Sequence, residues 1–264
     1  MKTRLLTAIL ASTLSNAAAM AYHGAWAANG DDFSLGAGFD YSSGNYGLAA
    51  DTSMLIIPVQ GTYRTGPWTF KLTVPYVQIT GPGGVLPNGL RSKSTRTTAT
   101  TTRSTTHSGL GDVSASTTYN ITPGSESAPR VDLTGKIKFG TADTYLGTGQ
   151  NDYAAQVDLY QPLGRFTPMG SLGYEVLGSP AGLALNNVAY GTVGGDYRLT
   201  DETHTGVQYF LSQRIAASIP EQKELTVYMN HSIDDNLNVR AYVLKGFSDA
   251  SPDSGVGLML YSYF

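Results

Sequence analysis

Residues 130–140 read Arg-Val-Asp-Leu-Thr-Gly-Lys-Ile-Lys-Phe-Gly, and apolar and polar side chains alternate along them. A period of two places successive side chains on opposite faces, so this stretch predicts a β-strand with one apolar and one polar face. The stretches 203–214 and 237–247 alternate in the same way. In the first stretch, one face carries Val131, Leu133, Gly135, Ile137 and Phe139, and the other carries Asp132, Thr134, Lys136 and Lys138.

The same alternation along the chain predicts about 12 strands, each near the length that crosses a bilayer at a tilt. Tight turn signals at 65–67, 162–164, 200–202 and 234–236 separate longer links such as 81–108 and 141–150, and the turn at 122–129 is expected to be unusually long. This arrangement predicts an all-β fold, a transmembrane antiparallel up-and-down β-barrel. The predicted strands are 33–42, 53–64, 68–80, 109–121, 130–140, 151–162, 165–178, 186–199, 203–215, 222–232, 237–248 and 254–264.

The composition also agrees with a protein that crosses a membrane with β-strands. Charged residues are 14% of the chain, whereas soluble proteins average about 25%. Mean hydropathy is −0.13, and no run of apolar residues is long enough for a membrane helix. The net charge of −3 argues against nucleic acid as a partner. A secreted soluble β-sandwich remains as an alternative, and it predicts a protein that dissolves without detergent.

The N-terminus has the three-part layout of a secretory signal peptide. Lys2 and Arg4 precede a short apolar stretch, 5–14, and small residues lead to Ala25-Trp26-Ala27. We expect cleavage after Ala27, with Ala21 as an alternative site. The predicted organisation is a signal peptide at 1–27 and an outer-membrane barrel at 28–264.

Aromatic residues gather near the predicted strand ends, where tyrosine and tryptophan favour the membrane–water boundary. The last strand ends on Phe264, which is similar to the signal that outer-membrane assembly machinery recognises. An open sheet would leave unpaired backbone groups in lipid, so this strand is expected to pair with the first, near 33–41. The aromatic residues are Tyr63, Trp68, Tyr119, Tyr145, Tyr153, Tyr160 and Tyr197.

Several local strings resemble a known family. They are Thr-Val-Pro-Tyr-Val at 73–77, Ser-Gly-Leu-Gly-Asp at 108–112, Lys-Phe-Gly-Thr at 138–141 and Leu-Gly-Thr-Gly-Gln-Asn-Asp-Tyr at 146–153. In this order they resemble the MetA-pathway of phenol degradation family of outer-membrane barrels, over about residues 33–264. The resemblance implies an outer-membrane location, a barrel and a transport role, with uptake of aromatic compounds suggested by the family name. It implies no catalytic motif.

Side chains at alternate positions of a strand share one face, a relation we call strand parity. It places the charged side chains inside the barrel, because a Lys or Arg facing lipid costs about 2–4 kcal/mol. We predict a polar constriction for passive passage of small organic solutes, in which Tyr228 and Tyr242 contact an organic ring. The alternative is that opposite charges pair across the lumen and brace a non-conducting barrel with a structural or surface-interaction role. The predicted lumen residues are Asp40, Arg64, Lys71, Asp112, Asp132, Lys136, Lys138, Asp158, Glu175, Asp196, Arg198, Arg214, Glu224, Tyr228, Arg240 and Tyr242.

No enzyme, cofactor or metal site is predicted. Asn230-His231-Ser232 brings a histidine beside a serine, but neighbouring strand residues point to opposite faces and the pair cannot easily touch. The chain has no cysteine and no histidine pair with metal-ligand spacing. The basic, low-complexity loop 81–108 is expected to be a solvated extracellular loop, with contact to lipopolysaccharide phosphates or an inward gating fold as alternatives.

Overall fold

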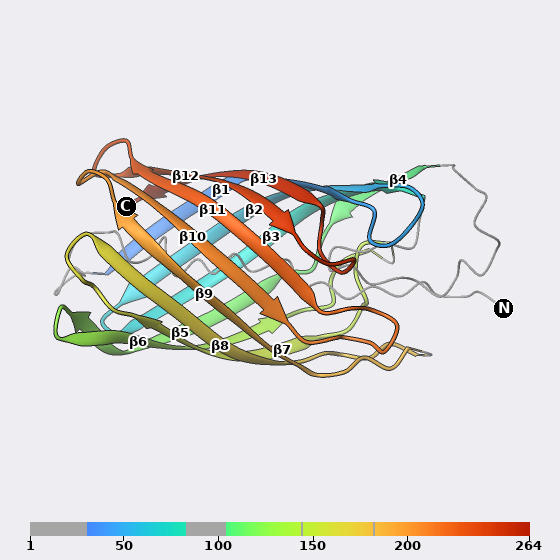
Figure 1. Ribbon diagram of the computed structural model, residues 1–264, viewed down its shortest axis with the longest axis horizontal. Helices are drawn as coiled ribbons and strands as arrows, with labels where there is room; N and C mark the ends of the chain where they lie inside the picture. Colours follow the sequence, from blue (N-terminus) through green and yellow to red (C-terminus); the bar gives the residue numbers. More distant parts are fainter. Residues whose placement is uncertain (1–30, 83–103, 144, 182) are drawn as a thin grey trace.

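Alternating side chains build a closed antiparallel barrel, seen from the side in Figure 1. The computed structural model describes residues 31–82, 104–143, 145–181 and 183–264. The predicted signal peptide and most of the predicted loop 81–108 lie outside the described residues. Among those residues, no helix is long and apolar enough to cross a bilayer.

The strands follow the predicted ranges closely. They are β1 (Asp32–Gly44), β2 (Thr52–Thr65), β3 (Trp68–Gly81), β4 (Thr105–Leu110), β5 (Ser114–Ser125), β6 (Ala128–Lys138), β7 (Asp152–Tyr160), β8 (Phe166–Val176), β9 (Val188–Arg198), β10 (Thr203–Ser212), β11 (Gln222–Ser232), β12 (Leu237–Gly246) and β13 (Ser254–Tyr263). Short turns join them at one end of the barrel, on the left in Figure 1, and longer loops join them at the other. We call these the periplasmic and extracellular ends, as in other outer-membrane barrels.

The first and last strands pair and close the barrel. β1 pairs with β13 from Ser34 opposite Tyr263 to Ser43 opposite Ser254. Beyond the ladder, the backbone N–H of Phe264 donates to the carbonyl of Phe33 at 2.9 Å, and their rings lie 6.2 Å apart. The predicted closure is confirmed, and it leaves no open edge in the membrane.

One predicted strand is divided in two. β4 pairs with the extracellular part of β3 and β5 pairs with its periplasmic part, so together they occupy one of the 12 strand positions of the barrel. Between them, Gly111 N–H donates to the carbonyl of Pro75 at 2.8 Å. Pro75 has no N–H to continue the ladder, which gives a physical reason for the break in the predicted strand 109–121.

Two predicted links were too long. β4 spans 105–110, so it begins within the predicted loop 81–108. β5 runs on to Ser125 and β6 begins at Ala128, so only Glu126 and Ser127 lie between them, and the expected long turn 122–129 is wrong. A register shift between Asn120 and Thr122 lets β5 continue past the expected end.

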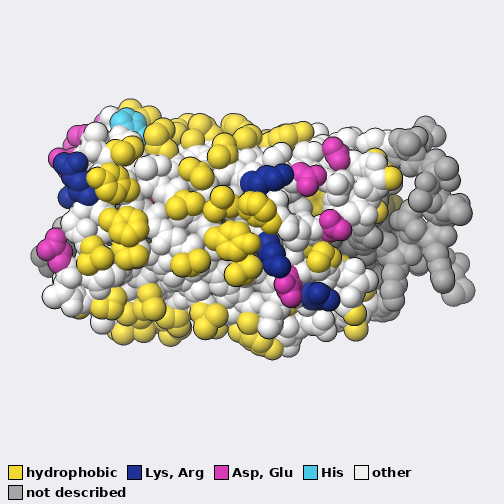
Figure 2. Space-filling view, viewed as in Figure 1, with side chains coloured by type: hydrophobic (Ala, Val, Ile, Leu, Met, Phe, Trp, Pro, Cys, Tyr) yellow, Lys and Arg dark blue, Asp and Glu magenta, His cyan; other side chains and the backbone are white. Residues whose placement is uncertain are grey.

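Large apolar side chains cover the outer surface. Figure 2 shows them spread between charged side chains at the periplasmic end and a second group of charges right of centre. Leu172 on β8 is 70% exposed, which water would not favour on such a broad apolar surface. This surface belongs against lipid, so the chain is an outer-membrane barrel and the soluble sandwich is excluded.

Most of the predicted aromatic residues lie on the outside near strand ends, and the others need correction. Tyr160 is buried in the lumen and belongs to the same face as Asp158 two residues earlier. Tyr145 lies in the loop 139–151, where its ring stacks on His107 at 4.4 Å. Of the predicted aromatic residues, Tyr63, Trp68, Tyr153 and Tyr197 are exposed near strand ends, and Tyr119 is exposed in the middle of β5, opposite Trp68 at the start of β3.

Candidate functional site

Most of the predicted lumen residues lie on the inner side of the barrel. Their side chains are buried or half-buried and alternate with the exposed lipid-facing residues. Contact with a solute is not tested by this placement and stays a prediction. The inward residues are Asp40, Arg64, Lys71, Asp112, Asp132, Lys136, Lys138, Asp158, Glu175, Asp196, Glu224, Tyr228, Arg240 and Tyr242.

Two predicted lumen residues lie at the ends of the barrel instead. Arg198 ends β9 at the periplasmic rim, where its side chain is 46% exposed and 4.0 Å from the carboxylate of Asp201. Arg214 follows the end of β10 in an extracellular loop, and its side chain is 60% exposed. Arg214 lies beyond the last paired residue of β10, where strand parity no longer determines the direction of a side chain. Arg198 is the last residue of β9 and pairs with His204, but at the rim its side chain extends out of the lumen. Both positions were therefore assigned wrongly to the lumen.

A central cluster of buried side chains lies in the lumen. It joins Tyr160 on β7, Met169 on β8, Tyr228 on β11, and Tyr242 and Leu244 on β12. These strands form two neighbouring pairs, β7–β8 and β11–β12, and β9 and β10 lie between the pairs in the sheet. Sequence reasoning had singled out Tyr228 and Tyr242, but it missed the other three because they are apolar or were assigned to the outer surface.

The two tyrosines of this cluster lie in one row of the sheet. Tyr228 is directly opposite Tyr242, and each has a glycine directly opposite on its other side, Gly206 and Gly257. The two rings lean away from each other over these glycines. Both rings therefore lie along the wall of the barrel instead of projecting across it.

The hydroxyl group of each tyrosine donates a hydrogen bond to a carboxylate in the same row. The Tyr228 hydroxyl donates to Asp196 on β9 at 3.0 Å, and the Tyr242 hydroxyl donates to Asp40 on β1. Asp196 also lies 3.2 Å from His204 Nδ1. The row presents two aromatic faces between two acids, an arrangement that suits contact with an organic molecule carrying polar groups.

Cations lie on both sides of the cluster. Arg130, which parity could have found beside Asp132, contacts that carboxylate at 2.8 Å and lies 6.0 Å from the Tyr160 ring. On the other side, the Arg240 guanidinium lies 4.6 Å from the centre of the Tyr228 ring. Both contacts have the geometry of cation–π interactions.

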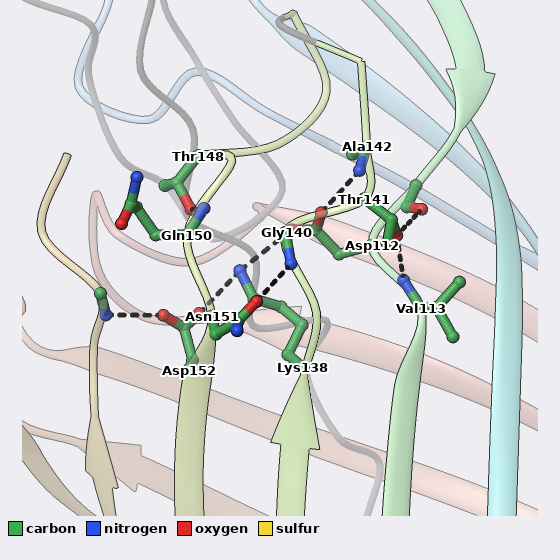
Figure 3. Close-up of polar contacts among 12 residues, drawn as sticks. Asp112, Val113, Lys138, Gly140, Thr141, Ala142, Thr148, Gln150, Asn151 and Asp152 are labelled. Atoms are coloured by element: carbon green, nitrogen blue, oxygen red, sulfur yellow. Dashed lines mark hydrogen bonds and ion pairs between the residues drawn. The ribbon is translucent and has the colours of Figure 1, made fainter.

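The strings that resemble a known family meet around one lysine, shown in Figure 3. Lys138 Nζ lies 2.9 Å from Asp112 and 2.7 Å from Asp152, and all three side chains are buried. Asp112 also accepts from the N–H of Ala142, and Asp152 accepts from the N–H of Gly178. The three charged groups therefore hold two extracellular loops against the barrel.

Asp152 was missed as an inward residue, although it shares the parity of Asp158 on β7. Some lumen charges therefore pair with one another along the wall of the barrel. Others, such as Lys71, point inward and form no ion pair within the described ranges, and these are the candidates for a solute path.

Two apolar clusters pack at the extracellular mouth. Leu146, 1% exposed, extends from the loop 139–151 onto Met54, Val77 and Ile79 of the inner wall. Burial here raises the pKa of Tyr46, so its hydroxyl stays neutral in this cluster. A second cluster joins the other loops and consists of Leu177, Val188, Ile215, Ala216, Ile219 and Ala250.

Comparison with solved structures supports the fold. The COG4313 outer membrane channel from Pseudomonas putida F1 superposes with a TM-score of 0.63 at 12% identity, over 89% of this chain and 96% of that one. The NanC porin has a TM-score of 0.57 at 10% identity, over 87% and 99% of the two chains. The translocator domain of the autotransporter NalP from Neisseria meningitidis gives 0.55 at 12%, over 96% and 98%.

At these identities the likeness concerns the fold alone. No protein-family profile and no curated protein sequence matches the chain. The resemblance to the MetA-pathway of phenol degradation family therefore stays a prediction. Within the described ranges, no group of three histidine, aspartate or glutamate side chains is arranged to hold a metal ion.

Proposed function

We propose that this chain is a passive outer-membrane channel for small organic solutes. The observation that carries the proposal is the central cluster, in which aromatic and thioether side chains lie together in a lumen lined elsewhere by charged groups. A solute with an apolar body and a polar group would meet complementary surfaces at this level. Methionine adapts its shape readily, so Met169 suits contact with more than one solute.

Conductance of the purified protein in planar bilayers tests the proposal. Met169→Ala shortens a side chain of the central cluster, and we expect it to raise single-channel conductance. Leu172→Ala, on the same strand but facing lipid, is the matched control and is expected to conduct like the wild type. A silent bilayer for wild type and Met169→Ala, with correct folding confirmed, would overturn the proposal.

A non-conducting structural barrel is the second candidate, and the packing of loops at the extracellular mouth favours it. Loops pack inward on two apolar clusters, and Lys138 fixes two of them through buried ion pairs. This candidate expects Met169→Ala to remain silent while lowering stability. The same bilayer recording therefore separates the two candidates.

Aromatic compounds are the solute class that the family resemblance suggests, and we propose them as substrates to be tested first. No catalytic role is proposed. His231 Nδ1 shares a hydrogen bond with Thr203 Oγ1 at 2.9 Å, and the serine beside it in sequence alternates to the opposite face. Hydrolysis of detergent-dispersed phospholipid by the wild type, lost in His231→Ala, would contradict this.

Lipid, lipopolysaccharide and the assembly machinery are the proposed partners. Phe264 is 73% exposed at the end of the closing strand, where another protein can reach it. We expect Phe264→Ser to lower the amount of folded barrel in the outer membrane, while refolding into detergent is retained. An unchanged amount in cells would argue against recognition through this residue.

A further inference from the structure

A pocket opens at the periplasmic end of the lumen, between β10 and β13. Side chains of His204, Asn230, Arg240 and Tyr261 line it, and Glu202 lies at its rim. It is separate from the central cluster, although Arg240 contacts both. Of its polar groups, His204 already contacts Asp196, whereas the side chains of Arg240 and Asn230 have no hydrogen-bond partner among the described residues.

Arg240 is the unusual group. Its side chain is 2% exposed, and within the described residues none of its three guanidinium nitrogens has a hydrogen-bond partner. The Tyr228 ring covers one face of the guanidinium, but a ring face accepts no hydrogen bond in the guanidinium plane. Arg240 is one of the residues that line the pocket.

Asn230 is placed to assist. It is directly opposite Arg240 in the β11–β12 ladder, and its amide nitrogen and oxygen are also buried without a partner among the described residues. An amide N–H beside a guanidinium is a donor set for an anion with two oxygens. Paired strands hold both side chains at a fixed separation, so the site is built before any ligand arrives.

A buried cation without a counter-charge is unfavourable, so a partner is expected. Asp196 and Asp132 are two inner-wall carboxylates that other donors already engage. Asp196 accepts from Tyr228 and lies beside His204, and Asp132 accepts from Arg130. Arg240 is therefore left to a ligand from solution.

The pocket favours a singly charged carboxylate over phosphate. The planar fork of arginine matches the two oxygens of a carboxylate. The Glu202 carboxylate at the rim would repel a second negative charge on the ligand. The side chains of Tyr261 and Tyr263 also line the pocket and offer aromatic surface to the organic part of such a molecule.

We propose that Arg240 and Asn230 bind the carboxylate of a small organic acid at the periplasmic end of the lumen. This inference rests on the proposed function for its biological meaning, because it names the class of solute that the channel would carry. The binding itself is a separate property of the folded barrel.

Calorimetric titration of the folded, detergent-solubilised protein with benzoate tests the site. We expect saturable binding of benzoate and none of benzamide, its neutral counterpart. Arg240→Gln should weaken benzoate binding by about tenfold or more, as a charge-assisted contact is lost. Arg214→Gln, the same change on an exposed loop, is the control and should bind like the wild type.

Arg240→Lys keeps the positive charge, so it serves as a second variant in case Arg240→Gln does not fold. We expect it to bind benzoate more weakly than the wild type, because the fork is lost. Wild type that does not bind benzoate, or Arg240→Gln and Arg240→Lys that bind it unchanged, would overturn the inference. Inorganic phosphate binding as tightly as benzoate would overturn the carboxylate assignment.

The outcomes separate this site from the channel. Benzoate binding by a protein that is silent in bilayers would leave the site standing and refute the channel. The opposite result would be a wild type that conducts but does not bind benzoate, with a conductance that Arg240→Gln leaves unchanged. It would refute the site and leave the channel standing.

Discussion

Tyr242 lies flat over Gly257, the residue directly opposite it on β13. A side chain at position 257 would occupy the space of the ring, so the ring can rest on the wall only where glycine is present. The same relation holds between Tyr228 and Gly206 on the other side of the row. These two glycines decide which way the tyrosines lean and how wide the lumen is between them.

Gly257→Ala should displace the Tyr242 ring from the wall and break its contact with Asp40. We expect a loss of about 1–3 kcal/mol in the free energy of unfolding, as in other overpacked sites, together with a change in conductance. Urea unfolding in detergent measures the first effect. Gly135→Ala is the control, since a Cβ there has open space. Equal stability of the two variants would contradict the role of Gly257.

Lys138→Met should leave the carboxylates of Asp112 and Asp152 buried without their cation. Removing one partner of a buried ion pair costs about 3–5 kcal/mol, and we expect a loss of that size in the free energy of unfolding. Lys245→Met, on an exposed lysine, is the control. Adding Asp112→Asn and Asp152→Asn to Lys138→Met should recover part of the loss, and no recovery would show that charge is not the cause.

Leu146→Ser should release the loop 139–151 from the inner wall. The side chain is buried against Met54, Val77 and Ile79, and losing such contacts typically costs about 2–5 kcal/mol. We expect faster protease cleavage within the loop and a higher conductance. Leu163→Ser, in an exposed periplasmic turn, should change neither property. Unchanged cleavage in Leu146→Ser would mean that Leu146 does not hold the loop.

Trp68 offers a direct test of the lipid face. It is half-exposed on the outside, 4.7 Å from the Tyr119 ring, near the periplasmic end of β3. With cleavage after Ala27, it is the sole tryptophan of the mature chain. We expect lipids brominated near the head group to quench its fluorescence more than lipids brominated near the chain ends. Quenching by aqueous iodide with no effect of brominated lipid would contradict the orientation of this surface.

The strands could be predicted because their signal is local. Val131 and Asp132 belong to opposite faces whatever their neighbours do, and the turn residues mark where each strand stops. The errors come where local signals end. Arg214 lies beyond the last paired residue of β10, and the predicted strand 109–121 is interrupted where β3 presents Pro75.

The candidate site was only partly predictable. Parity placed Tyr228, Tyr242 and Arg240 inside the barrel, but it carries no information about which residue stands opposite which. That Tyr242 faces Gly257 depends on the register between β12 and β13, and register is a property of two segments together. The lack of a partner for Arg240 likewise depends on where Asp196 and its donors lie.

From its sequence alone, this chain is determined to be a cylinder of strands with an apolar outside and a polar inside, because alternation is written residue by residue and lipid accepts no unpaired backbone. Tertiary structure decided which side chains cluster in the lumen, which charges pair and which cation lines a pocket. Those features arise from distances between strands far apart in the chain, and pairing across the barrel sets such distances only once it has closed.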